Sequence, residues 1–180
     1  MPEGYSYSMN EAVNVANLAY SDIEKYLNRF NETIKITNVE NDEFYREKDI
    51  DMIWERNVDG VQQQITIEIK GDRYHHTGNL FFETISNDQK NTPGCFLYTE
   101  ANYLFYYFVY SKELHILPMP ETRNWFLENE HLYTKTVKTS TVNNAGEFMY
   151  NTLGKLLPKK DLREASIPGY KIVKLKKSLK

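Results

Sequence analysis

Strict alternation of apolar and polar positions marks two segments of the chain as strands. In residues 49–55 (DIDMIWE), every second position from Ile50 onward is apolar, which places Asp49 and Asp51 on the opposite face. Residues 63–70 (QQITIEIK) alternate in the same way, with isoleucines on one face and polar side chains on the other. We therefore expect two strands, each with one face turned toward a hydrophobic core.

The sequence between these two segments is typical of a tight turn. Asp59-Gly60 is a pair that readily accepts positive φ, as a two-residue hairpin turn requires. An antiparallel hairpin across this turn would collect Asp51, Glu68 and Lys70 on its polar face. Its apolar face is expected to pack on a helix.

Further helices and strands follow from the same kind of pattern. Residues 8–11 (SMNE) are typical of a capping box at a helix start, and apolar residues at three- and four-residue steps predict a helix over about 9–30. Other strands are expected at 33–39, 80–86, 103–110, 113–117 and 170–175, and other helices from Pro120 and over 146–157. The run at 103–110 (YLFYYFVY) predicts a strand that is buried on both faces. The pattern predicts an α/β (α+β) fold with a central mixed β-sheet flanked by helices.

Length and composition favour one soluble domain spanning residues 1–180. The chain has 180 residues, of which 41% are hydrophobic and 26% charged. No apolar run reaches the roughly 18 residues of a membrane span, and the first ten residues lack the pattern of a secretion signal. We expect no membrane partner and a cytoplasmic location. The single cysteine, Cys95, excludes an internal disulfide and a thiolate cage for a metal.

Charge is unevenly distributed along the chain. The formal net charge is −3, and residues 171–180 contain five lysines and no acidic residue, so the remaining residues carry about −8. We interpret residues 171–180 as a basic tail. Such a tail is either a solvated terminus or a guide for an anionic partner.

The polar face of the predicted hairpin has the composition of a metal site. Asp51 and Glu68 would repel each other inside a sheet unless a cation lies between them. Mg²⁺ prefers oxygen ligands of this kind. Lys70 would then stabilise an attacking hydroxide or the negative charge that develops on a phosphate. These residues favour metal-dependent hydrolysis of a phosphodiester.

Asp51 followed by Glu68-Ile69-Lys70 resembles the PD-(D/E)XK nuclease superfamily, which has the restriction-endonuclease-like fold. The resemblance covers about residues 9–110 and implies Mg²⁺, with Mn²⁺ as a substitute, bound by Asp51, Glu68 and the carbonyl group of Ile69. It implies that Lys70 is the catalytic lysine. The family motif has proline before the aspartate, and this chain has isoleucine there.

The resemblance also implies a substrate and an oligomeric state. DNA would be the partner, cleaved as by an endonuclease or an exonuclease. Small nucleases of this fold often act as homodimers, and the exposed side of residues 103–110 could form the contact.

Several further residues are candidates around this motif. By resemblance, Glu83 could supply another catalytic acidic group, or it could be a solvated residue at a sheet edge. Asp49 is the rival of Asp51 as metal ligand. Glu24 could reach the metal from the first helix, but a surface position is favoured. His75 and His76 could contact phosphate, although adjacent histidines on a loop are more often solvated.

Two other functions fit parts of the sequence. The chain could be a non-catalytic member of the nuclease fold that acts as a binding or assembly subunit. Asp49-Ile50-Asp51 also resembles the DxD motif of nucleotidyltransferases, although no Gly-Ser helix start precedes it. Five of the 14 tyrosines fall within residues 98–110, which favours a role in the core or in a subunit interface over stacking with bases.

Overall fold

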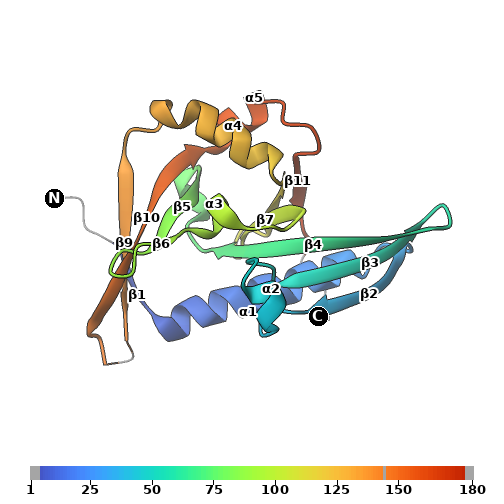
Figure 1. Cartoon of the computed structure of the whole chain (residues 1–180), viewed down its shortest axis with the longest axis horizontal. Coiled ribbons are helices and arrows are strands. Elements are labelled where there is room, and N and C mark those ends of the chain that lie inside the picture. Colours follow the sequence, from blue (N-terminus) through green and yellow to red (C-terminus); the bar gives the residue numbers. More distant parts are fainter. Residues whose placement is uncertain (1–4, 144, 177–180) are drawn as a thin grey trace.

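The computed structural model describes residues 5–143 and 145–176 as two β-sheets with helices packed around them (Figure 1). The six-stranded sheet has the order β11-β8-β7-β4-β3-β2, and the five-stranded sheet has the order β1-β9-β10-β5-β6. The strands of the first are β2 (Thr33–Asn38), β3 (Met52–Val58), β4 (Val61–Asp72), β7 (Tyr103–Phe108), β8 (Glu113–Pro118) and β11 (Lys171–Lys174). Those of the second are β1 (Tyr5–Ser8), β5 (Asn79–Asn87), β6 (Thr92–Pro93), β9 (Thr136–Val142) and β10 (Phe148–Pro158). The helices are α1 (Met9–Leu27), α2 (Glu43–Arg46), α3 (Cys95–Tyr98), α4 (Glu121–Asn129) and α5 (Lys159–Glu164), with short 3₁₀ turns η1 (His75–Thr77) and η2 (Glu130–Leu132).

The six-stranded sheet is mixed, as expected. β4 and β7 are parallel, whereas the β2–β3, β3–β4, β7–β8 and β8–β11 pairs are antiparallel. This arrangement confirms the predicted α+β class. The strand predicted at residues 80–86 is β5, but its place in a second sheet was not predicted. None of the helices in the described parts of the chain is long and apolar enough to cross a membrane.

The predicted hairpin is β3–β4, and its turn has the predicted conformation. Asp59 has φ of 52° and Gly60 has φ of 83°, both in the left-handed region that such a turn needs. Met52 pairs with Ile67 in the resulting register, which brings Asp51 opposite Glu68 where β3 begins. Figure 1 shows the far end of this hairpin extending well beyond the rest of the molecule.

Helix α1 covers the apolar face of the hairpin. The capping box is present, because the Ser8 side chain accepts from the Glu11 N–H and the Glu11 carboxylate accepts from the Ser8 N–H. The buried residues that share this packing are Ala19, Ile23 and Leu27 of α1 with Met52, Trp54 and Ile67 of the hairpin. Ala12 and Ala16, in the N-terminal half of α1, are exposed.

Ile50 departs from the predicted alternation. Asp49 has φ of 55°, so regular strand geometry begins only at Met52. Ile50 packs with Val39 and Ile53, in a cluster separate from that of Met52. The prediction that Ile50 and Met52 share a face is therefore wrong, because a left-handed residue precedes the strand.

The predicted helix over residues 146–157 is instead strand β10. Met149, Leu153 and Leu157 recur every four residues, which imitates a helix, but β10 is hydrogen-bonded to both β9 and β5. Gly154 fits this pairing, since a Cβ there would lie 2.4 Å from the carbonyl oxygen of Phe82. Contacts made far along the sequence decide the structure of this segment.

The two sheets share a hydrophobic cluster. Leu80, Phe82 and Leu157 of the five-stranded sheet are buried with Leu104 and Phe108 of the six-stranded sheet. The cluster is closed by Phe96 of α3 and Phe126 of α4, and the rings of Phe82 and Phe96 stack with their centroids 3.9 Å apart.

β7 lies inside the six-stranded sheet, between β4 and β8. Its residues from Leu104 to Phe108 are buried, as predicted for this aromatic run. The expectation that one side of the run is exposed for a dimer contact is therefore wrong for this strand, and Tyr110 just beyond it is exposed.

The predicted basic tail is structured in its first part. Residues 171–174 form β11, which pairs with β8, and the following Leu175 is buried. Residues 177–180 lie outside the described residues. The first part of the tail is therefore an edge strand rather than a solvated terminus.

Candidate active site

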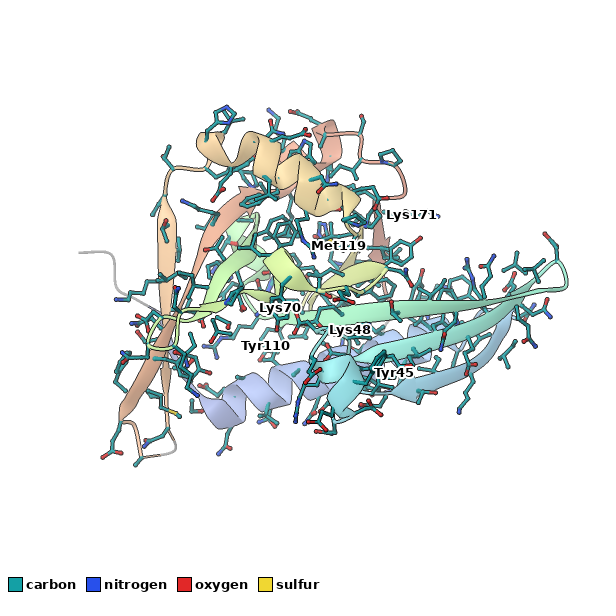
Figure 2. All side chains as sticks on the ribbon, viewed as in Figure 1. Tyr45, Lys48, Lys70, Tyr110, Met119 and Lys171 are labelled. Carbon is teal, nitrogen blue, oxygen red and sulfur yellow. The ribbon has the colours of Figure 1, made fainter. Side chains whose placement is uncertain are left out.

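The polar side of the hairpin borders a cavity of about 600 Å³. Its walls come from α1, the end of β4, β5, α3 and parts of β7, β9 and β10. Figure 2 shows Lys70 near the centre of the molecule, where β4 ends between α1 and α3. The expected site is therefore enclosed by the second sheet and does not face outward from a single sheet.

The cavity is strongly acidic. Seven acidic and two basic residues are among those that line it: Glu11, Glu40, Asp49, Asp51, Glu68, Asp72, Glu83, Lys70 and Arg73. An anionic ligand would be repelled from such a cavity unless a cation entered with it. The composition of the lining thus favours binding of a cation.

Asp51 is held in place by the backbone of the opposite strand. The Ile69 N–H donates to Asp51 Oδ2 at 2.9 Å, a hydrogen bond from backbone to side chain at the point where the regular β3–β4 pairing ends. Burial raises the pKa of Asp51, and the hydrogen bond from Ile69 opposes that shift. Ile69 itself lines the cavity beside Asp51 and Glu68.

Glu68 is the most buried carboxyl group of the site. Glu68 is only 7% exposed, and its Oε2 atom is buried without a hydrogen-bond partner among the described residues. Burial, together with the charges of Asp51 and Asp49, raises the pKa of Glu68 well above its usual value. An unpaired polar atom in such a place costs about 1–3 kcal/mol. A hard divalent cation would satisfy this oxygen and is suited to the carboxylates of Asp51 and Glu68.

Lys70 is ion-paired with Glu83 of the second sheet. The Lys70 side chain is 29% exposed and that of Glu83 is 12% exposed. Glu83 therefore lies inside the cavity and is not a solvated residue at a sheet edge. The pair joins β4 to β5 inside the cavity.

Asp49 also enters the cavity, although it lies before the strand. The Tyr98 hydroxyl donates to Asp49 Oδ1 at 3.1 Å, and Thr99 Oγ1 donates to the Asp49 carbonyl at 2.7 Å. Burial raises the pKa of Asp49 to about 6. Asp49 and Asp51 thus both border Glu68, so the structure does not exclude either as a metal ligand.

Cys95 is a cavity residue that the sequence did not single out. Its Sγ and one carboxylate oxygen each of Asp49 and Glu68 lie within 4.8 Å of one another. Its position depends on Gly94, because a Cβ there would lie 2.3 Å from the Glu83 carbonyl oxygen, and this contact could not be foreseen from the sequence. Only glycine allows α3 to approach β5 so closely.

A second glycine brings α1 to the site. A Cβ at Gly71 would lie 3.0 Å from Val15 Cγ1 and 3.1 Å from the Ala19 Cβ, so α1 packs tightly on the residue after Lys70. Tyr20 of α1 lines the cavity, and burial with the nearby charges of Glu24, Glu40 and Asp51 raises its pKa to about 12.

Tyr106 connects three strands behind the cavity. Its hydroxyl donates to Asp72 of β4 and accepts from the Phe81 N–H of β5 at 2.9 Å, and the side chain is fully buried. The bridge fixes β5, and with it Glu83, against the end of β4.

Three other candidates do not line the cavity among the described residues. Glu24 is half-buried on α1 and is not among the described residues that line the cavity. His75 and His76 are exposed on η1 and are likewise outside the described lining. The favoured interpretations of these three residues as surface groups agree with their positions.

Comparison with known proteins found no relative. No family model matches the chain, and no match was found among the curated proteins or the solved structures. The family resemblance of the motif therefore stays a hypothesis, and the function is inferred from the site itself.

Proposed function

We propose that the protein is a metal-dependent nuclease that hydrolyses phosphodiester bonds in DNA. The observation that carries this proposal is the buried, unpartnered Oε2 of Glu68, which lies in a cavity shared with Asp51 and Lys70. A catalytic cation would remove the cost of that oxygen, and a lysine beside it suits a reaction in which negative charge develops. We place the activity in the cytoplasm, since a chain with one cysteine suits a reducing compartment.

Asp51, Glu68 and the carbonyl group of Ile69 would hold Mg²⁺, or Mn²⁺ as a substitute. When bound, the ion would polarise the scissile phosphate and lower the pKa of the attacking water. The hydrogen bond from the Ile69 N–H keeps Asp51 turned toward Glu68, so the two carboxylates are already arranged before the ion arrives. This arrangement reduces the reorganisation that binding requires.

Lys70 would stabilise the charge on the phosphate, and Glu83 would orient Lys70. Because Glu83 is mostly buried and ion-paired, it holds the ammonium group inside the cavity rather than in solvent. Glu83 could also arrange the attacking water as a hydrogen-bond acceptor. Lys70 and Glu83 therefore form an ion pair within the same cavity as Asp51.

The order of elements supports the same proposal. The resemblance implies a helix, then a hairpin with the acidic motif, then a further strand, and the chain has α1, β3–β4 and β7 in that order. The intact Asp51, Glu68 and Lys70 favour an active enzyme over the alternative of a non-catalytic binding subunit.

The test is cleavage of a mixed DNA panel by the purified chain with Mg²⁺, with Mn²⁺ and with EDTA. Cleavage should require the divalent ion and should disappear in Asp51→Asn. Glu40→Gln is the matched control, because Glu40 also lines the cavity but is an exposed residue outside the proposed ligand set. Undiminished cleavage by Asp51→Asn would overturn the assignment, and DNA binding without cleavage would favour a non-catalytic subunit.

A further inference from the structure

We infer that Asp49, Glu68 and Cys95 form a second cation site, which overlaps the proposed Mg²⁺ site at Glu68 and binds Zn²⁺ or another thiophilic divalent ion. The three ligand atoms lie within 4.8 Å of one another. They come from three separate elements, namely the residue stretch before β3, the strand β4 and the helix α3. Proximity in the sequence therefore does not account for their convergence.

Two buried carboxylate oxygens without hydrogen-bond partners are a further indication that a ligand binds between Asp49, Glu68 and Cys95. Asp49 Oδ2 and Glu68 Oε2 are both buried without a hydrogen-bond partner in the described part of the chain. Glu68 is more than nine-tenths buried as a residue, and both side chains line the cavity. Each unpaired oxygen costs about 1–3 kcal/mol. One cation bound by both carboxylates would offset both costs.

The site is held in place by contacts outside the three ligands. Tyr98 donates to Asp49 Oδ1, so Asp49 is oriented by the same helix that carries Cys95. The Arg123 guanidinium donates to the carbonyls of Phe96 in α3 and of Thr99 directly after it, at 2.9 and 2.6 Å, which anchors α3. Metal sites commonly have such hydrogen bonds, which hold the metal ligands or the elements that carry them in position.

The type of ligand separates this site from the proposed Mg²⁺ site. Mg²⁺ takes oxygen ligands, whereas a thiolate selects softer ions such as Zn²⁺. Zn²⁺ accepts Cys sulfur together with Asp or Glu oxygen, and three protein ligands leave a fourth position open. On binding, a bond forms between Cys95 Sγ and the ion, and the thiol proton is released to solvent.

The two sites share Glu68, which predicts competition between them. A Zn²⁺ ion bound by Asp49, Glu68 and Cys95 would occupy the Glu68 carboxylate that the Mg²⁺ site needs. We therefore expect Zn²⁺ to inhibit cleavage, a consequence that rests on the proposed nuclease function. The Zn²⁺ site itself does not depend on that function.

Binding is tested first, without DNA, by titrating the full chain with Co²⁺ as a spectroscopic probe for Zn²⁺. The wild type should show thiolate-to-cobalt charge-transfer absorption, and this absorption should be lost in Cys95→Ser. Zn²⁺, measured by titration calorimetry, should bind the Cys95→Ser and Asp49→Asn variants more than about 100-fold more weakly, since even outer partners of metal ligands are often worth about 10- to 100-fold. Glu40→Gln should bind as the wild type does.

A wild-type Co²⁺ spectrum without a thiolate band, or equal Zn²⁺ affinity in Cys95→Ser, would overturn the site. Cys95→Ala is the second variant if the serine protein does not fold. Cleavage assays then separate the two proposals. Both proposals are supported if Mg²⁺ supports cleavage and Zn²⁺ inhibits that cleavage in the wild type but not in Cys95→Ser. If Zn²⁺ binds through Cys95 and no divalent ion supports cleavage, the nuclease proposal alone fails. Cleavage by a protein that does not bind Zn²⁺ through Cys95 contradicts only this inference.

Discussion

Lys70 of β4 and Glu83 of β5 form an ion pair inside the cavity, so each sheet contributes one member of the pair. The pair connects the hairpin predicted from the sequence to the sheet that was not predicted. It also fixes the position of the only lysine that lines the cavity among the described residues.

Replacement of Lys70 by alanine should abolish most of the cleavage while the protein stays folded. The loss should be about 100- to 1000-fold in rate, as for the removal of one group that stabilises transition-state charge. Initial rates on labelled DNA with Mg²⁺ measure it. Lys112→Ala is the control, because Lys112 is 27% exposed and ion-paired with Asp22, much as Lys70 is with Glu83, but does not line the cavity. Equal rates for the two variants would contradict the role of Lys70.

Unpaired DNA should be cleaved faster than intact duplex of the same sequence. The carboxylates of the proposed metal site lie within a cavity of about 600 Å³ that both sheets border, so a strand must leave its partner to reach them. Unpairing costs a few kcal/mol, which predicts a difference of about 100-fold. Rates on a single strand, a duplex with frayed ends and a closed circular duplex measure it. Equal rates on all three substrates would mean that the cavity opens to admit a duplex.

The metal-free protein should become more stable as the pH falls from about 7 to about 5. The pKa of Asp49 is about 6, above the value of 3.8 of a free carboxyl group, so the folded state binds the proton more tightly than the unfolded state does. Protonation therefore stabilises the fold, by on the order of 1 kcal/mol between pH 7 and pH 5. Urea unfolding at several pH values measures the gain.

The matched variant for this experiment is Asp49→Asn, which should gain less stability than the wild type over the same range. The range stops at about pH 5 because a second carboxyl group, Glu113, begins to act in the opposite direction below it. Burial raises the pKa of Glu113, but its contacts with Lys159 and His115 outweigh that effect and lower the pKa to about 2. That carboxylate loses its stabilising effect as the pH falls below about 4.5 toward 2. A wild type and a variant with identical pH dependence would contradict the assignment to Asp49.

Replacement of Tyr106 by phenylalanine should lower the free energy of unfolding by about 1–3 kcal/mol. The hydroxyl satisfies Asp72 and the Phe81 N–H in a fully buried place, and its loss leaves both without this partner. Chemical denaturation compares the variant with Tyr110→Phe, in which the exposed Tyr110 should tolerate the change. Equal stability of the two variants would mean that the bridge contributes nothing.

Local signals predicted the hairpin and the polar side chains that it brings together. The left-handed pair Asp59-Gly60 fixes the register of β3 and β4, and the register alone places Asp51 opposite Glu68. Such a result needs no information from distant parts of the chain. The helix α1 was predicted for the same reason, because its cap lies within four consecutive residues.

The second sheet could not be predicted in this way. β10 pairs with β5 about 70 residues earlier in the chain, and its spacing of apolar residues resembles that of a helix. β9 (TVKTSTV) is rich in β-branched residues, which was an available sign of a strand. Because this sheet borders the site, the enclosure of Glu68 and the position of Cys95 were missed with it.

The two halves of helix α1 have different surroundings. Its C-terminal half is packed into the core through Ala19, Ile23 and Leu27, while Ala12 and Ala16 in its N-terminal half are exposed and border the cavity. A larger side chain at Ala12 or Ala16 would narrow the cavity without displacing a buried residue. Substitution of these two alanines, in evolution or by engineering, would therefore change the size of ligand that the cavity admits while the fold keeps its stability.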